Sequence, residues 1–283
     1  MRKKISEERL HELIEQVLFD IDESKINSKT IKMTDIVLDR TETYDATKQN
    51  CWSFRKKGDI RDNIDINLGN MVSGYPFEMF GHSFKDSECA YIAGCYSDKS
   101  KRCFDIQTEL SNYTKGGFNA KNEFRKATTE KTSYIRKDWT SFNFDFMLLV
   151  IWSKCNSNED FKNVLLSIPE NAHIIEDTSY HHGATSDIWG AKNIILTKLR
   201  KQKCVEIEQK LIEEGVTVKK TIESAQQIVE NRINNYGKWI GRNATGKAIK
   251  MCQLALLNNT TPPINYKLLN SKKIYWFGEL LKF

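Results

Sequence analysis

The sequence predicts a compact α+β fold that is mostly helical and contains few short strands. Two observations support this class. Long stretches in which apolar residues recur at helical spacing outnumber the stretches with a strand pattern. Between 50 and 85, Gly and Pro divide short apolar pieces in the way that is typical of turns between short strands. A chain of 283 residues with 40% hydrophobic residues suits one large domain, or a core domain that carries an insertion.

The N-terminal part predicts an amphipathic helix at 6–20. Ser6 is a suitable cap, and Glu7 and Glu8 favour the positive end of the helix dipole. Apolar residues then repeat at helical spacing as far as Ile21. We therefore expect an N-terminal helical extension.

The middle of the chain predicts a series of helices and one clear strand. The stretch "KDSECAYIAGCY" (85–96) begins a helix, with Asp86 or Ser87 as its cap. The other expected elements are helices at 102–113, 118–127, 136–155 and 159–167, and a short strand, "AHIIEDT", at 172–178. The expected division is 1–49 for the extension, 50–257 for the main domain and 258–283 for a C-terminal segment that packs on it.

Residues 194–235 are charged and helix-periodic, and Gly215 divides them into two halves. This pattern predicts a helical hairpin, inserted at about 191–240. Its basic run "KLRKQK" (198–203) is either a solvated face or a contact for phosphates. The following stretch, 237–257, reads as a Gly-rich turn that leads into a helix.

Composition restricts the classes of function. Lys and Arg exceed Asp and Glu by 43 − 37 = 6, which permits a phosphate-bearing ligand or a nucleic acid but demands neither. The longest apolar run, "FMLLVIW", is far shorter than the roughly 20 residues of a membrane span. Seven cysteines without a C-x-x-C are typical of reduced thiols. We expect a soluble cytoplasmic protein that needs no cofactor and no membrane.

Two motifs give weak signals. His181 and His182 are adjacent, and adjacent histidines make poor zinc co-ligands, so we expect them on a loop and expect no metal. "GRNATGK" (241–247) resembles a phosphate loop loosely, but its glycines do not have the P-loop spacing. Lys247 at a helix start would suit an anion, or the segment is only a capped helix entry.

Carboxylates give a stronger signal through their order. Glu88 opens a helix, and Glu176 and Asp177 end a strand; singly, each is most simply a solvated side chain. Together with the positions between them they form a colinear pattern over roughly 50–257. Its pieces are Phe54, "LGN" (68–70), "FKDSECAY" (84–91), "DW" (138–139), "SKC" (153–155), "IIE" (174–176), "WG" (189–190) and "GRNATGK" (241–247).

In these pieces the sequence resembles the NADAR superfamily. That group includes an N-glycosidase of riboflavin-biosynthesis intermediates and hydrolases of ADP-ribosylated guanine in nucleic acid. The resemblance implies a NADAR-like domain with an inserted helical hairpin. It implies Glu88, Glu176 and Asp187 as catalytic candidates. Implied ligand-binding residues are Asn70, Tyr91, Trp189, Gly190, Asn243, Gly246 and Lys247.

The sequence departs from the family pattern in three places. Many members have a lysine seven residues after the helix-opening glutamate, where this chain has Cys95, which cannot form an imine with an opened ribose. The acid that usually lies three residues before the Trp is replaced by Ser186, and Asp187 lies one residue closer. The connection at 191–240 is also much longer than in the family.

The resemblance implies hydrolysis of an N-glycosidic bond, with ADP-ribosyl-guanine in DNA or RNA as the expected substrate. Glu88 would stabilise the positive charge that develops at the anomeric carbon, and Glu176 would orient ribose hydroxyls or the water. Trp189 would stack on the base. Three alternatives remain: a riboflavin intermediate as the substrate, a non-catalytic ADP-ribose or nucleotide-binding module, and an interaction protein that works through its hairpin. The sequence gives no oligomeric state.

Overall fold

The computed structural model describes residues 5–19, 29–126, 130–183, 185–234 and 236–283. The end of the first predicted helix, residue 20 and Ile21, lies outside these ranges. The α-helices are α1 (Glu7–Leu18), α2 (Ser87–Cys95), α3 (Lys101–Ser111), α4 (Gly117–Ala120), α5 (Asn143–Ser157), α6 (Glu159–Ser167), α7 (Ser186–Trp189), α8 (Ile194–Glu213), α9 (Lys219–Ile233), α10 (Ala244–Leu257) and α11 (Tyr266–Ser271).

The remaining regular elements are short. The 3₁₀-helices are η1 (Met33–Asp35), η3 (Glu130–Tyr134) and η4 (Trp139–Ser141), and a π-helix, η2 (Lys121–Lys126), follows α4. The strands are β1 (Glu42–Asp45), β2 (Cys51–Phe54), β3 (Ile60–Arg61), β4 (Ile64–Asp65), β5 (Phe77–Met79), β6 (His82–Phe84), β7 (His173–Glu176), β8 (Lys238–Gly241), β9 (Tyr275–Trp276) and β10 (Glu279–Leu280). The mostly helical α+β class is confirmed.

The parallel pair β2–β7 separates two hydrophobic cores. Side chains alternate between the faces of a strand. On one face Trp52, Phe54 and Ile174 belong to the larger core, which α2, α3, α5 and α10 enclose. On the other face Cys51 and Ile175 belong to a second core. This alternation decides which way the last residues of β7 point.

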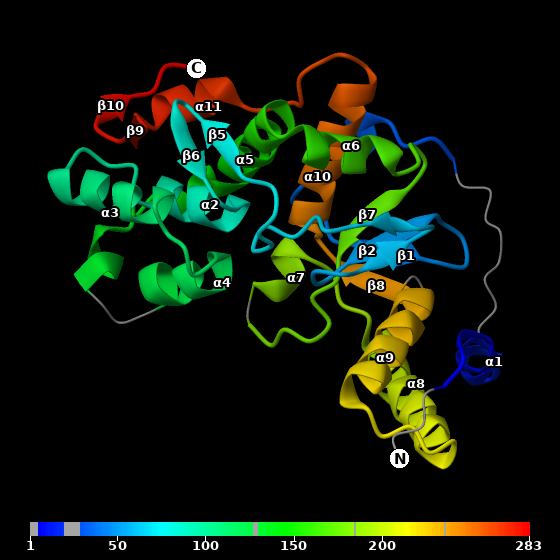
Figure 1. The fold of residues 1–283 in the computed structure, drawn as a ribbon. Helices are drawn as coiled ribbons and strands as arrows, with labels where there is room; N and C mark the ends of the chain where they lie inside the picture. The colour runs from blue at the N-terminus through cyan, green and yellow to red at the C-terminus, as the bar shows by residue number, and fades with distance from the viewer. Residues whose placement is uncertain (1–4, 20–28, 127–129, 184, 235) are drawn as a thin grey trace.

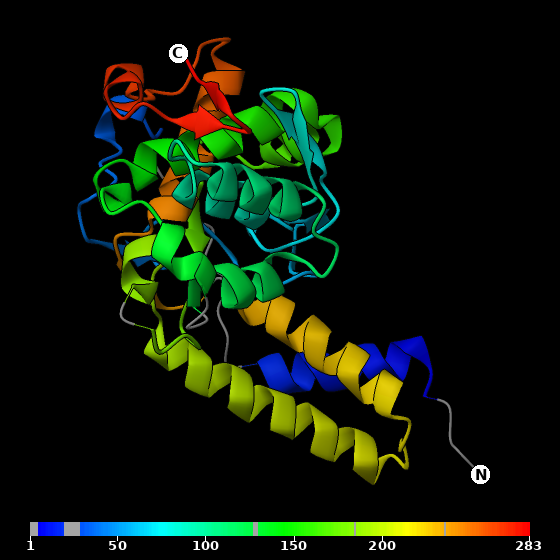
Figure 2. The same cartoon turned by 90° about the vertical axis from the view of Figure 1, so that its left-hand side faces the viewer.

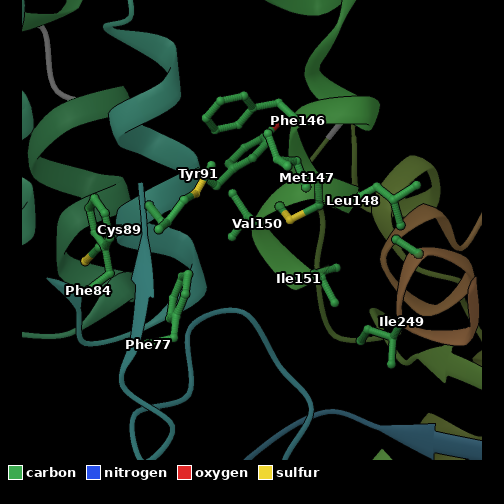
Figure 3. Packing of buried hydrophobic residues seen from close by; sticks show 14 of the residues in the cluster. Phe77, Phe84, Cys89, Tyr91, Phe146, Met147, Leu148, Val150, Ile151 and Ile249 are labelled. Atoms are coloured by element: carbon green, nitrogen blue, oxygen red, sulfur yellow. The ribbon is translucent and has the colours of Figure 1, made fainter. Parts of the chain in front are cut away.

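The larger core is built on α2 and α5. Figure 3 shows Tyr91 of α2 close to Phe146 and Val150 of α5, with Ile249 of α10 on the far side of α5. Gly94 of α2 permits this packing, because a Cβ there would lie 2.3 Å from the Phe146 ring. The C-terminal segment also packs here, through Trp276.

The second core joins the predicted hairpin to α1. Helices α8 and α9 pair antiparallel around Gly215, whose φ of 81° favours glycine. Figures 1 and 2 show the pair extending away from the rest of the chain, with α1 lying against it. Leu13 and Val17 of α1 are buried with Ile207 and Val229 of the hairpin.

Four sequence expectations need correction. The stretch 136–155 is not one helix, because η4 precedes α5. Residues 118–126 form α4 and a π-helix instead of one α-helix. The N-terminal region also contributes a strand, β1, and the turn before α10 contains its antiparallel partner β8. Strand pairing between such distant segments has no local signal.

Within the described residues, no helix is long and apolar enough to cross a membrane.

Candidate active site

Glu88 occupies the second position of α2, a helix whose start is fixed from both sides. The Asp86 side chain caps the helix by accepting from the Cys89 N–H at 2.9 Å. The Glu88 N–H donates to the Asn70 carbonyl, also at 2.9 Å. The Glu88 side chain is only 4% exposed, and its Oε1 has no hydrogen-bond partner among the described residues. A buried carboxylate oxygen without a partner is costly.

Glu176 is the last residue of β7 and shares a strand face with Ile174, so it points toward the larger core. Its backbone N–H is held by the Asn243 Oδ1 at 2.9 Å. In the described part of the chain its Oε2 is buried and has no hydrogen-bond partner. A second carboxylate thus lies on the same side of the β2–β7 pair as α2.

The negative charge of Glu88 affects the ionisation of Glu176. Burial raises the pKa of Glu88, while the charges of Lys121 and Arg125 lower it. Burial also raises the pKa of Glu176; the Thr245 hydroxyl lowers it, and the negative charge of Glu88 raises it further. Such an effect requires proximity. Lys121 therefore counteracts burial at both carboxylates, and Arg125 does so at Glu88.

Aromatic rings border this pair. Tyr91, one turn after Glu88 on α2, lies edge-on to Trp189 with ring centroids 5.5 Å apart. Phe144 packs on the other side of Trp189 at 4.9 Å. The Tyr91 hydroxyl is buried without a hydrogen-bond partner in the described residues; burial raises its pKa, and the negative charge of Glu88 adds to that rise. We call Glu88, Tyr91, Glu176 and Trp189 the carboxylate site.

Asp177 follows Glu176 but faces the opposite way. Its Oδ2 accepts from Arg200 of α8 at 2.6 Å, and its Oδ1 accepts from the Ser179 N–H at 3.0 Å. Arg200 in turn donates to the Asn234 side chain. Asp177 and Arg200 are both almost fully buried. This ion pair joins the hairpin to the end of β7 and leaves Asp177 committed to structure.

The remaining predicted residues lie on α7, on the loop after β7 and beside the start of α2. Asp187 is exposed on α7, where its carbonyl accepts from the Arg242 N–H at 2.7 Å. His181 and His182 are exposed on the loop after β7. Among the described residues, no group of His, Cys, Asp and Glu side chains is arranged to hold a metal ion. Asn70 is buried next to the start of α2, with its Nδ2 3.3 Å from the Met147 Sδ.

The predicted phosphate segment, 241–247, forms internal bonds instead of a free loop. Asn243 is fully buried in a left-handed conformation, φ 53°, and its side chain bridges the Glu176 N–H and the Ile174 carbonyl. Gly246 lies against β7, because a Cβ there would come 2.3 Å from the Ile174 carbonyl oxygen. These positions serve the close packing of α10 on β7.

Lys247 and Gly190 have similar structural roles. The Lys247 Nζ donates to the Val37 and Arg40 carbonyls at 2.7 and 2.8 Å and lies 3.3 Å from the Glu42 carboxylate. These partners take up its three donors. Gly190 has no room for a side chain, since a Cβ would lie 2.5 Å from the Glu176 carbonyl oxygen. The Lys247 ammonium therefore has no free donor for the phosphate that the sequence analysis expected it to bind.

The π-helix η2 brings basic residues that the sequence analysis did not single out. Arg125 lies over the Tyr91 ring at 5.3 Å, and the positive charge of Lys121 acts on Glu88, Glu176 and His181. Gly117, the first residue of the preceding helix α4, packs tightly, because a Cβ there would lie 2.7 Å from the Glu88 Cβ. In the sequence these basic residues are visible only as Lys121, Arg125 and Lys126, at a spacing that an ordinary solvated helix would also have.

Cys95 is buried on the last turn of α2. Its Sγ lies 3.8 Å from the Tyr91 carbonyl, and burial raises the pKa of its thiol to about 12. A thiol that stays protonated at neutral pH is a poor nucleophile. Cys95 therefore serves as a buried side chain of the larger core.

A separate cavity of about 670 Å³ lies at the other end of β7. The N-terminal segment 29–49 lines it together with His173, Lys247 and Lys250. Burial lowers the pKa of Lys250 to about 8, and its ammonium donates to the Glu170 carbonyl at 2.7 Å. The lining contains neither Glu88 nor Glu176, so this cavity and the carboxylate site are distinct.

The chain was compared with known families, curated proteins and solved structures. Models of known protein families give no match to the chain, and neither do the curated proteins. Among solved structures, the NMR structure of the E. coli protein YbiA matches, with 18% sequence identity and a TM-score of 0.38, over 59% of this chain and 88% of that protein. A TM-score this low assigns no role to any side chain.

Proposed function

We propose that this protein is an N-glycosidase that removes ADP-ribose from a guanine base in nucleic acid. The observation that carries the proposal is the pair of buried carboxylates, Glu88 and Glu176, each with an oxygen that lacks a hydrogen-bond partner among the described residues, beside the rings of Tyr91 and Trp189. Unpaired buried acceptors are expected where a ligand supplies the partner. The NADAR resemblance supplies the reaction class, and the cytoplasm is the expected compartment.

The electrostatics divide the work between the two acids. Glu88 has basic neighbours and is the better candidate for the ionised carboxylate that stabilises the oxocarbenium-like charge. Burial and the negative charge of Glu88 raise the pKa of Glu176. Glu176 is therefore the better candidate for the general acid that protonates the departing nitrogen. After departure, the carboxylate of Glu176 can accept a proton from the attacking water. Trp189 would hold the base.

A second candidate, a non-catalytic ADP-ribose-binding module, is favoured by Cys95. A buried thiol with a pKa of about 12 replaces the lysine of many family members. Such a module would use the same carboxylate site for binding and would release no product.

Mass spectrometry on a panel of substrates separates these functions. The wild-type protein is incubated with ADP-ribosylated DNA, ADP-ribosylated RNA, free ADP-ribose, NAD and a flavin precursor. Release of ADP-ribose with recovery of unmodified guanine is the expected result. Turnover of the flavin precursor alone would transfer the proposal to that substrate. Binding of ADP-ribose without any turnover would support the binding module, and neither binding nor turnover would overturn both.

A further inference from the structure

The π-helix η2 places three basic residues in one short segment next to the carboxylate site. In a π-helix, which closes i to i+5 bonds, the residues at i+4 and i+5 lie about one turn above residue i. Lys121 is therefore flanked on its own face by Arg125 and Lys126. π-Helical turns are rare and are often found at functional sites.

This segment is held firmly against α2. Arg125 stacks on the Tyr91 ring at 5.3 Å, and Gly117, just before η2, touches Glu88 so closely that no side chain would fit. The acid on the same segment, Glu123, is paired outward with Lys115 at 3.0 Å. Within the described residues no hydrogen bond or salt bridge is recorded for Lys121, Arg125 or Lys126, whose positive charges all act on Glu88.

We propose that Lys121, Arg125 and Lys126 bind the diphosphate of the ADP-ribosyl group, a proposal that rests on the proposed function. In such a substrate the diphosphate is attached one ribose ring away from the carbon that loses the base. A site for it therefore needs cations beside carboxylates, which is the arrangement of η2 beside Glu88 and Glu176. Charge-assisted contacts from Lys and Arg are the usual means of holding phosphate oxygens.

Two other places in the molecule could be considered for the diphosphate, and the first is the 241–247 segment. Lys247 is held by the Val37 and Arg40 carbonyls, and Gly246 is pressed against β7, so that segment has little to offer a phosphate. The rival location is the cavity at the other end of β7, where the exposed Lys48 is part of the lining.

Calorimetric binding with three probes tests the proposal: ADP-ribose, inorganic pyrophosphate, and adenosine, which lacks phosphate. Lys121→Gln is expected to weaken ADP-ribose binding at least about tenfold, as the loss of one charge-assisted contact implies. It should weaken pyrophosphate binding similarly and leave adenosine binding within about twofold. Lys121→Arg keeps the charge and should restore affinity. Lys48→Gln is the matched control in the cavity and should change none of the three.

Three results would overturn the proposal. Equal losses for adenosine and ADP-ribose would show a general distortion of the site. A loss of pyrophosphate binding in Lys48→Gln but not in Lys121→Gln would place the anion in the cavity. A wild-type protein that binds neither ADP-ribose nor pyrophosphate would exclude the diphosphate site. If the wild type binds ADP-ribose through Lys121 but cleaves no substrate, the proposed function fails while the binding site stands.

Discussion

Buried polar groups are satisfied in one part of this molecule and left open in another that lies next to it. In the 241–247 segment the side chains of Asn243 and Lys247 have their partners within the protein. In the carboxylate site Glu88 and Glu176 each have an oxygen without a hydrogen-bond partner in the described residues. Both regions contact β7, so the difference does not come from depth in the fold.

The difference separates architecture from a site for ligand. An unpaired buried acceptor costs about 1 to 3 kcal/mol, more when it is charged. Such a cost is retained where another molecule supplies the missing partner or where strain serves chemistry. The comparison therefore predicts that substitutions in the carboxylate site lower activity without lowering stability, and that substitutions in the 241–247 segment lower stability.

The largest expected effect is on catalysis in Glu88→Gln. This variant keeps the size of the side chain and removes the charge, so kcat/KM should fall by about 10²- to 10³-fold or more, as for the loss of other preorganised electrostatic groups. Affinity for ADP-ribose should stay within several-fold, since ground-state contacts are kept. Steady-state kinetics with calorimetry measure both quantities. Wild-type turnover in this variant would remove Glu88 from the catalytic role.

The next largest effect is on stability in Asn243→Ala. Two backbone groups, the Glu176 N–H and the Ile174 carbonyl, lose their partner, which should lower the unfolding free energy by roughly 2 to 4 kcal/mol. The left-handed backbone, φ 53°, adds strain for alanine. Asn243→Gly is the control, because glycine accepts this φ and should lose less. Urea denaturation measures the change, and unaltered stability in Asn243→Ala would contradict the structural role.

A smaller effect concerns pH. Burial raises the pKa of Glu88 above the ordinary value of 4.5, so between pH 4.5 and its folded-state pKa the folded protein keeps a proton that the unfolded chain has released; above that pKa the carboxylate is ionised in both states. The unfolding free energy of the wild type should therefore fall as pH rises from about 4.5 through the folded-state pKa. Glu88→Gln has no carboxylate to ionise at this position. Its unfolding free energy, relative to that of the wild type, should therefore increase from pH 4 to pH 8. Denaturation at several pH values measures the trend.

The exposed Glu213 at the end of α8 provides the control for this pH series. Glu213→Gln removes one exposed carboxylate, so a trend that it shares with Glu88→Gln would come from the lost charge and not from burial. If the unfolding free energy of Glu88→Gln instead decreased relative to the wild type as pH rises, the protein would stabilise the charged form of Glu88. That result would contradict the contrast between the unpaired carboxylate site and the hydrogen-bonded 241–247 segment.

The smallest effect is expected for Cys95→Ser. The thiol has a pKa of about 12, so it is not the nucleophile, and activity should stay within about twofold. Iodoacetamide should not label Cys95 in the folded protein, because the side chain is fully buried. Mass spectrometry of the alkylated protein and the kinetics of the variant check both statements. A large loss of activity with intact folding would give Cys95 a role in the site.

The sequence determined much of the local structure. Ser6 caps α1 as predicted, by accepting from the Arg9 N–H, and α6 covers the predicted range 159–167. The strand in 172–178 and the helix that begins near Ser87 were also predicted correctly. These elements depend on caps, helical spacing and turn residues, all of which act between neighbours in the chain, so they can be recognised in the sequence alone.

Only the tertiary structure decided which polar residues are free. Glu176 and Asp177 are both acids at the end of one strand, but the alternation of β7 turns one toward α2 and the other toward Arg200 of the hairpin. Lys247 follows a glycine-rich turn, yet the Val37 and Arg40 carbonyls occupy it from more than 200 residues earlier. Partners so distant along the chain have no local signature, because hydrogen bonding and desolvation depend on what the fold brings together.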